Sequence, residues 1–147
     1  MRYKKKILVV SILVITALCL YVLFQDKFPP RTPHKIARIV SGLNIKNSFN
    51  VIEFRDDLHG DWAYSPSGEL LIVFSLDFDQ LEFLRKECEQ NKYQNLPIKN
   101  FLYTPDFAKE AGKGLYKLNK VGLDPLDYSL VVLSFTKKKL YVYVSDS

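Results

Sequence analysis

The sequence has only two cysteines, and this scarcity excludes a domain that is held together by disulfide bonds. Cys19 falls inside a long apolar run, so Cys88 stands alone in the rest of the chain. Free cysteine is among the most buried residue types, and we therefore interpret Cys88 as a small buried side chain. About 120 residues follow the apolar run, enough for one modest core without a metal or a disulfide.

The usual catalytic motifs are also missing. The sequence contains no glycine-rich phosphate-binding loop of either standard type and no Gly-x-Ser-x-Gly nucleophile motif. Cys88 with either His34 or His59 is a formal thiol–imidazole pair. Glu87 and Glu89 flank this cysteine, however, and negative neighbours raise the pKa of a thiol and disfavour its ionisation. We therefore expect a protein that is not an enzyme and has no cofactor.

A basic surface for nucleic acid is not expected either. The net charge is +5, from 21 basic and 16 acidic residues. Four of the basic residues precede the apolar run, and without them 17 basic residues face 16 acidic ones. The remainder is therefore close to neutral, whereas a nucleic-acid-binding domain shows clustered basic side chains. The four residues are Arg2, Lys4, Lys5 and Lys6.

The apolar run begins at Ile7 and ends at Phe24, and its eighteen residues contain no charge. A helix of this length spans about 27 Å, which is close to the thickness of a bilayer core. We predict that residues 1–24 form an uncleaved single-pass membrane anchor. Two other outcomes remain open: cleavage as a signal peptide after Ala17 and Cys19, or lipidation of Cys19, before which Leu18 replaces the expected small residue.

The predicted orientation follows from the basic residues, which crowd the first six positions and are sparser after the run. This distribution predicts an inner-membrane protein whose C-terminal part lies in the periplasm or outside the cell. Residues 25–31, which include Pro29 and Pro30, form a short stiff linker. One domain, residues 32–147, follows.

Two helices are predicted in this domain. Thr32 is suited to cap the first, with Pro33 at the first helical position and Gly42 at the C-terminal end. Asp77 and Gln80 have the spacing of a capping box for the second, which ends near Asn91. The apolar faces are predicted to consist of Ile36, Ile39, Val40 and Leu43 in the first helix, and of Phe78, Leu81, Leu84 and Cys88 in the second.

Five strands are predicted, over residues 51–55, 69–76, 115–118, 128–136 and 140–144. Residues 56–68 connect the first two as a hairpin, and 137–139 turn the chain between the last two. Residues 69–76 are almost wholly apolar and should form a central strand. Residues 93–113 are predicted to be mostly loop. The fold class is therefore α+β: an anchor helix, then a mostly antiparallel sheet of about five strands with two helices.

The densest polar cluster consists of Asp56, Asp57, His59 and Asp61, with Trp62 beside it. Asp57, His59 and Asp61 are candidate ligands of a divalent metal, and Asp57, Asp61 and Glu69 are candidate acid–base carboxylates. Their spacing does not fit a calcium loop. Aspartate, glycine and histidine are also typical turn residues, so we favour a structural turn and expect no metal.

Aromatic side chains are the main candidates for partner contacts. The aromatic residues in predicted loops or on strand faces that could be exposed are Trp62, Tyr64, Phe101, Tyr103, Phe107, Tyr141 and Tyr143. Aromatic anchors are typical of protein interfaces, and we select Trp62, Tyr64, Tyr141 and Tyr143 as the partner-binding candidates. The alternative interpretation is that they close the far side of a small sheet.

His59-Gly60-Asp61-Trp62, followed by Gly68-Glu69 and an apolar strand, resembles a group of small, uncharacterised, membrane-anchored bacterial proteins with a His-Gly-Asp-Gly hairpin. The likeness covers most of the chain after the linker, although Trp62 replaces a glycine and residues 137–139 replace an Asp/Asn turn. The group has no assigned activity, so the resemblance implies architecture and compartment alone.

These observations favour a membrane-tethered domain that binds a protein partner without catalysis, as an immunity, inhibitor or envelope-accessory factor. The alternative is a small hydrolase or metal-dependent enzyme that uses Asp57, His59 and Asp61. In a third interpretation, the anchor itself makes the functional contacts within a membrane complex.

Overall fold

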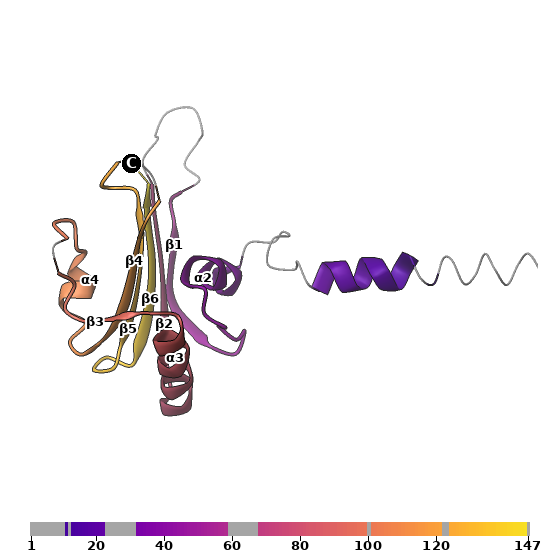
Figure 1. Ribbon diagram of the computed structural model, residues 1–147, viewed down its shortest axis with the longest axis horizontal. Helices are drawn as coiled ribbons and strands as arrows, with labels where there is room; N and C mark the ends of the chain where they lie inside the picture. The colour runs from indigo at the N-terminus through magenta and orange to yellow at the C-terminus, as the bar shows by residue number, and fades with distance from the viewer. Residues whose placement is uncertain are drawn as a thin grey trace, which may run out of the picture. The chain divides into compact units, whose positions relative to one another are not determined.

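The computed structural model describes residues 11, 13–22, 32–58, 68–99, 101–121 and 124–146 (Figure 1). The chain divides into two compact units, residues 1–31 and 32–147. In the first unit, residue 11 and residues 13–22 are helical. None of the helices formed by the described residues is long and apolar enough to span a bilayer. The predicted anchor lies partly outside the described residues and the predicted linker wholly outside, and both stay predictions.

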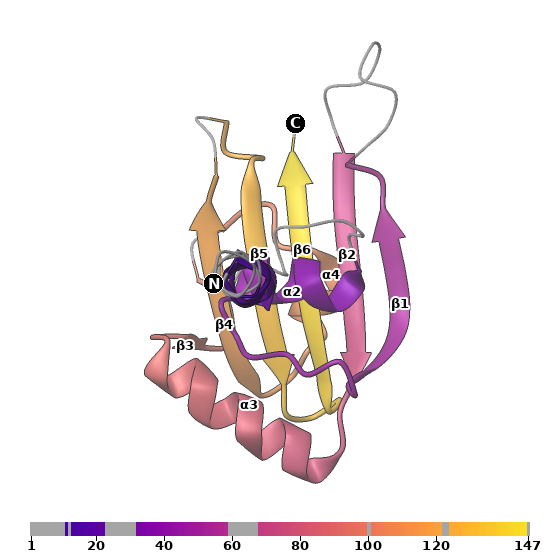
Figure 2. The ribbon, with the colours of Figure 1, turned by 90° about the vertical axis from the view of Figure 1, so that its right-hand side faces the viewer.

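The second unit is built on one antiparallel sheet of six strands in the order β1-β2-β6-β5-β4-β3 (Figure 2). The strands are β1 (Asn50–Asp56), β2 (Gly68–Ser75), β3 (Gln94–Asn95), β4 (Gly114–Lys120), β5 (Tyr128–Ser134) and β6 (Lys139–Asp146). The α+β class and the five predicted strands are confirmed, and β2 is central as expected. The predicted number of strands was one too low. Strand β3 has only two residues, both polar, and therefore shows no alternation of apolar side chains.

Two longer helices, α2 (Pro33–Ser41) and α3 (Phe78–Gln90), form where their caps predict them. The Thr32 hydroxyl accepts from the backbone N–H of Lys35 at 3.3 Å, and Gly42 ends α2 with a left-handed φ of 69°. Asp77 and Gln80 complete the capping box of α3. A short third helix, α4 (Asp106–Lys109), lies in the segment predicted to be loop. Its four residues are too few to show a helical period.

Two predicted core positions are wrong. Ile39 is 62% exposed and Phe78 is 66% exposed. In α2 the buried side is rotated by about one residue, because Ile36, Ala37 and Ser41 face the sheet and their small members let the helix approach it closely. Phe78 is the first residue of α3, and the buried face of this helix consists of Leu81, Leu84 and Cys88.

Both faces of the sheet are covered. Helices α2 and α3 lie on one face, and α4 with its flanking segment lies on the other (Figure 1). Side chains alternate along a strand, so Leu140 and Val142 enter the helix-side core while Tyr141 and Tyr143 enter the core on the second face. This division of β6 confirms the prediction from its sequence. The second face is therefore packed beneath residues 96–99 and 101–111, which leaves one end of it open.

Candidate functional site

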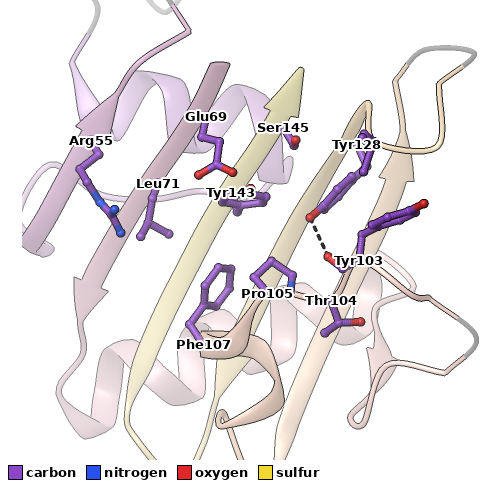
Figure 3. A pocket seen from close by; sticks show the side chains of 11 residues that line it. Arg55, Glu69, Leu71, Tyr103, Thr104, Pro105, Phe107, Tyr128, Tyr143 and Ser145 are labelled. Atoms are coloured by element: carbon purple, nitrogen blue, oxygen red, sulfur yellow. Dashed lines mark hydrogen bonds between the residues drawn. The ribbon is translucent and has the colours of Figure 1, made fainter. Parts of the chain in front are cut away.

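The open end of the second face holds a hollow of about 430 Å³ (Figure 3). We call it the tyrosine hollow, after the three tyrosines in its wall. Its lining comes from four strands, from α4 and from the segments that precede α4 and β5. The lining residues are Arg55, Glu69, Leu71, Tyr103, Thr104, Pro105, Phe107, Leu126, Tyr128, Tyr143 and Ser145.

The register of the strands determines which side chains form the floor of the hollow. Arg55 of β1 lies opposite Leu71 of β2, and Leu71 lies opposite Tyr143 of β6. One step further along the same face, Ser145 lies between Glu69 and Tyr128. Directly opposed residues project from the same face of a sheet, so these two rows share one surface. Residues that are far apart in sequence thereby meet.

The remaining wall is supplied by residues 103–107. The Phe107 ring stacks on Tyr141 with centroids 5.1 Å apart and lies 5.7 Å from the ring of Tyr143. The Tyr128 hydroxyl donates to the backbone carbonyl of Tyr103 at 3.0 Å. The Phe101 ring meets Tyr128 edge-on at 4.8 Å. These contacts hold the wall against the sheet, so the hollow is largely formed before anything binds.

The charges in the hollow are not equivalent. Arg55 Nε lies 3.0 Å from Glu53 Oε1, so a neighbour on its own strand offsets part of its charge. Glu69 forms no ion pair with any residue that the structure describes, and its carboxylate turns toward Tyr143 (Figure 3). A cation entering the hollow would thus find a carboxylate whose charge is not compensated.

The hydroxyls of Tyr143 and Tyr128 stay protonated, because the pKa of each is raised. Burial raises the pKa of Tyr143, as does the hydrogen bond that its hydroxyl donates to Glu69, while Ser145 opposes the shift. Burial also raises the pKa of Tyr128, and a hydrogen bond with Tyr143 partly offsets the rise. The two rings are therefore neutral, hydrogen-bonded and held in place against the sheet.

The polar cluster singled out in the sequence is only partly described. The backbone N–H of Asp57 donates to the carbonyl of Glu69 at 2.9 Å, which closes the β1–β2 ladder. His59 and Asp61 lie outside the described residues. The described residues contain no group of three side chains able to hold a metal ion. Asp56 lies opposite Leu70, toward the helix-side core, and its buried Oδ1 has no hydrogen-bond partner among the described residues.

The aromatic residues predicted to contact a partner are also only partly described. Trp62 and Tyr64 lie outside the described residues. Tyr141 and Tyr143 are buried on the second face, as the alternative interpretation expected, and Tyr143 also lines the hollow. Their role toward a partner stays a prediction. Sequence reasoning missed Arg55 and Tyr128, because only the strand register and the return of residues 103–107 bring them together with Tyr103.

Cys88 is confirmed as a buried thiol. Burial, followed by the charges of Glu87 and Glu89, raises its pKa to about 12. His34 is engaged elsewhere, since its Nε2 lies 2.8 Å from the backbone carbonyl oxygen of Phe49. The protonated thiol and the engaged imidazole do not make a nucleophile.

Comparison with known proteins gave no match. No family model fits the chain, and no significantly similar protein was found among curated proteins or among solved structures. The resemblance to His-Gly-Asp-Gly hairpin proteins is therefore still a prediction, and the functional argument rests on the hollow.

Proposed function

We propose that the chain is a membrane-anchored, extracytoplasmic binding module that holds a basic side chain of a protein partner in the tyrosine hollow. The observation that carries the proposal is the uncompensated Glu69 carboxylate beside the rings of Tyr143, Tyr128 and Phe107. Cations are attracted to the faces of aromatic rings and to carboxylates, and a site that offers both favours a guanidinium or an ammonium group.

The shape of the hollow favours a protein over a small metabolite. A volume of about 430 Å³ is at the small end of the range for ligand pockets. Glu69, Tyr103 and Leu126 are exposed at its rim, so a ligand would remain partly open to solvent. An inserted side chain surrounded by a wider contact is the usual form of a protein–protein hot spot. This role requires no catalysis.

A first prediction concerns the cation directly. We expect N-acetyl-arginine amide, added to the full chain in detergent micelles, to shift the amide resonances of Glu69, Tyr143 and Ser145. A dissociation constant on the order of 10 mM is reasonable for one cation–π contact with one carboxylate. Glu69→Gln should weaken this binding about fivefold, since it removes the charge and keeps the size of the side chain.

The matched probe is N-acetyl-citrulline amide, which has nearly the shape of arginine without its charge. The matched variant is Glu82→Gln, which removes an exposed carboxylate on α3. If the neutral probe shifts the same resonances equally, or if Glu69→Gln binds like wild type, the proposed recognition of a cation is wrong.

The location of the module rests on the sequence of residues 7–24 and on the basic residues before them. We expect alkaline phosphatase fused after Ser147 to be active in cells, because this enzyme requires an extracytoplasmic environment, and a cytoplasmic reporter at the same position to be inactive. The reverse pattern would place the domain on the other side. A fusion after Gln25 serves as the control, since it tests the anchor without the domain.

A further inference from the structure

Strand β1 lies at one edge of the sheet (Figure 2). Among the described residues it pairs only with β2, so its outer row of backbone groups has no strand beside it. Exposed edges of this kind are templates for pairing with another chain. The residues on this edge indicate which chain would fit.

One hydrogen bond shows which backbone N–H and C=O groups of β1 point away from the sheet. The Asp57 N–H donates to the carbonyl of Glu69 at 2.9 Å, so the backbone of Asp57 faces β2. Backbone direction alternates along an antiparallel strand, and the pairing is regular from Glu53 to Asp56. Arg55 and Glu53 therefore also face β2, whereas the N–H and C=O groups of Phe54 and Asp56 point away from the sheet.

The side chains on this edge are apolar on one face and charged on the other. Phe54 is 42% exposed, and it lies opposite Ile72 on the face that carries α2. Glu53 and Arg55 lie on the face that carries the tyrosine hollow, joined by the 3.0 Å ion pair. Each charge thus has an opposite charge two positions away on the same side of the strand.

We propose that β1 pairs antiparallel with β1 of a second copy, about a two-fold axis through Phe54. The two Phe54 residues then exchange backbone hydrogen bonds as directly opposed partners. Glu53 lies opposite Arg55 of the second copy, and Arg55 opposite Glu53 of the second copy. These are non-hydrogen-bonded positions, where opposed side chains are closest, so the two ion pairs of the monomers become one network of four charges.

Other registers are less favourable. A shift by one residue would set outward-facing backbone groups of one copy against inward-facing groups of the other. A two-fold axis at Glu53, Arg55 or Asp56 would place two identical charges directly opposite each other, which destabilises a strand pair. The axis at Phe54 avoids both faults and also joins two exposed phenylalanine rings.

The pairing is limited by the irregularity between Val51 and Glu53, which shifts the register of β1. Bulges and charges commonly protect an edge from unlimited pairing, and here the regular stretch is short. A short ladder predicts a weak dimer. Tethering in one membrane, a step that rests on the proposed anchor, would raise the effective concentration enough to populate it. The axis is perpendicular to the sheet, so α2 lies on the same face of the paired sheets in both copies.

Disulfide trapping tests the register. In the full chain with Cys19→Ser, reconstituted into phosphatidylcholine vesicles, Phe54→Cys should form a disulfide-linked dimer under mild oxidation. Opposed Cα atoms in a hydrogen-bonded pair are about 5.5 Å apart, within the range of a disulfide. Leu102→Cys is the control, because Leu102 is 93% exposed and distant from β1 in sequence. At least tenfold more dimer is expected from Phe54→Cys than from Leu102→Cys.

Charge reversal tests the complementarity in the same assay. Added to Phe54→Cys, Glu53→Arg or Arg55→Glu alone should reduce trapping severalfold, and the two together should restore it, because the opposed charges are then merely exchanged. Arg85→Glu, a reversal on α3, should leave trapping unchanged. Equal trapping at positions 54 and 102, or a double reversal that does not rescue, would overturn the proposal. Arginine-amide binding is measured separately, so either proposal can fail alone.

Discussion

Replacing Phe74 with alanine is expected to lower the free energy of unfolding by about 3–5 kcal/mol, the range for a large buried aromatic side chain. Phe74 is fully buried in central strand β2. Its ring meets the imidazole of His34 edge-on at 5.3 Å, so it joins the sheet to α2. Deleting it leaves a cavity between two layers that cannot close without moving the helix. Urea denaturation of the full chain in micelles, followed by far-ultraviolet circular dichroism, measures the loss.

Phe78→Ala is the matched control for this prediction. It removes the same side chain from a residue only four positions later, but one that is 66% exposed at the start of α3. Its effect should stay within about 0.5 kcal/mol, as for most surface substitutions. Similar losses from the two variants would mean that the helix-side core is not packed as described.

Local signals account for what the sequence predicts well. The capping residues of α2 and α3 determine where these helices begin, because Thr32 and Asp77 bond to the backbone of their own first turn. The apolar alternation in β6 and the continuous apolar run in β2 depend on burial of one or both faces of a strand. Neither signal requires knowledge of distant residues, and both predictions are confirmed.

Features that depend on distant contacts were missed. Strand β3 exists because Gln94 and Asn95 lie beside Tyr116 and Leu115 of β4, not because of any strand pattern of their own. Helix α4 forms where residues 101–111 return across the second face and place Ala108 and Ala111 against its tyrosines. The sequence shows the apolar residues of this segment but not the surface on which they pack.

The tyrosine hollow also depends on contacts between residues that are distant in sequence. Glu69 was considered in sequence only as a neighbour of Asp57 and Asp61, whereas the structure sets it beside Tyr143 and Tyr128 through the register of three strands. Register is a long-range property, determined by which faces can be buried together. The acid–base candidates, drawn from one hairpin, therefore could not include side chains from β5, β6 and residues 103–107, and Tyr143 of β6 was a candidate only as an aromatic partner contact.

Arg55 connects the two proposals. It lines the hollow and belongs to the edge that would meet a second copy. Pairing of two β1 strands would surround its guanidinium with Glu53 carboxylates from both copies. Arg55 would then contribute less positive potential to the hollow, and the negative potential of the Glu69 carboxylate would dominate there. Self-association should therefore strengthen binding of a basic side chain in the hollow.

Gly114→Ala is expected to cost about 3 kcal/mol, at the upper end for overpacking, because the added atom meets backbone that cannot yield. A Cβ on Gly114 would lie 2.1 Å from the carbonyl oxygen of Leu133. Gly114 is also held on the other side, where its carbonyl accepts from the Leu96 N–H at 3.0 Å. Relieving the overlap requires β4 to separate from β5 or the segment at Leu96 to shift.

Gly42→Ala is the control for this prediction. It measures the general cost of replacing a glycine where no steric overlap arises. Gly42 has a left-handed φ of 69°, but a Cβ there would meet nothing within 4 Å. Its cost should be about 1 kcal/mol, from backbone strain alone. The two variants are compared by urea denaturation, and equal losses would contradict the close approach of β4 and β5. Since β4 and β5 carry the Tyr128 side of the second face, Gly114→Ala should also broaden the resonances of the tyrosine hollow, whereas Gly42→Ala should leave them sharp.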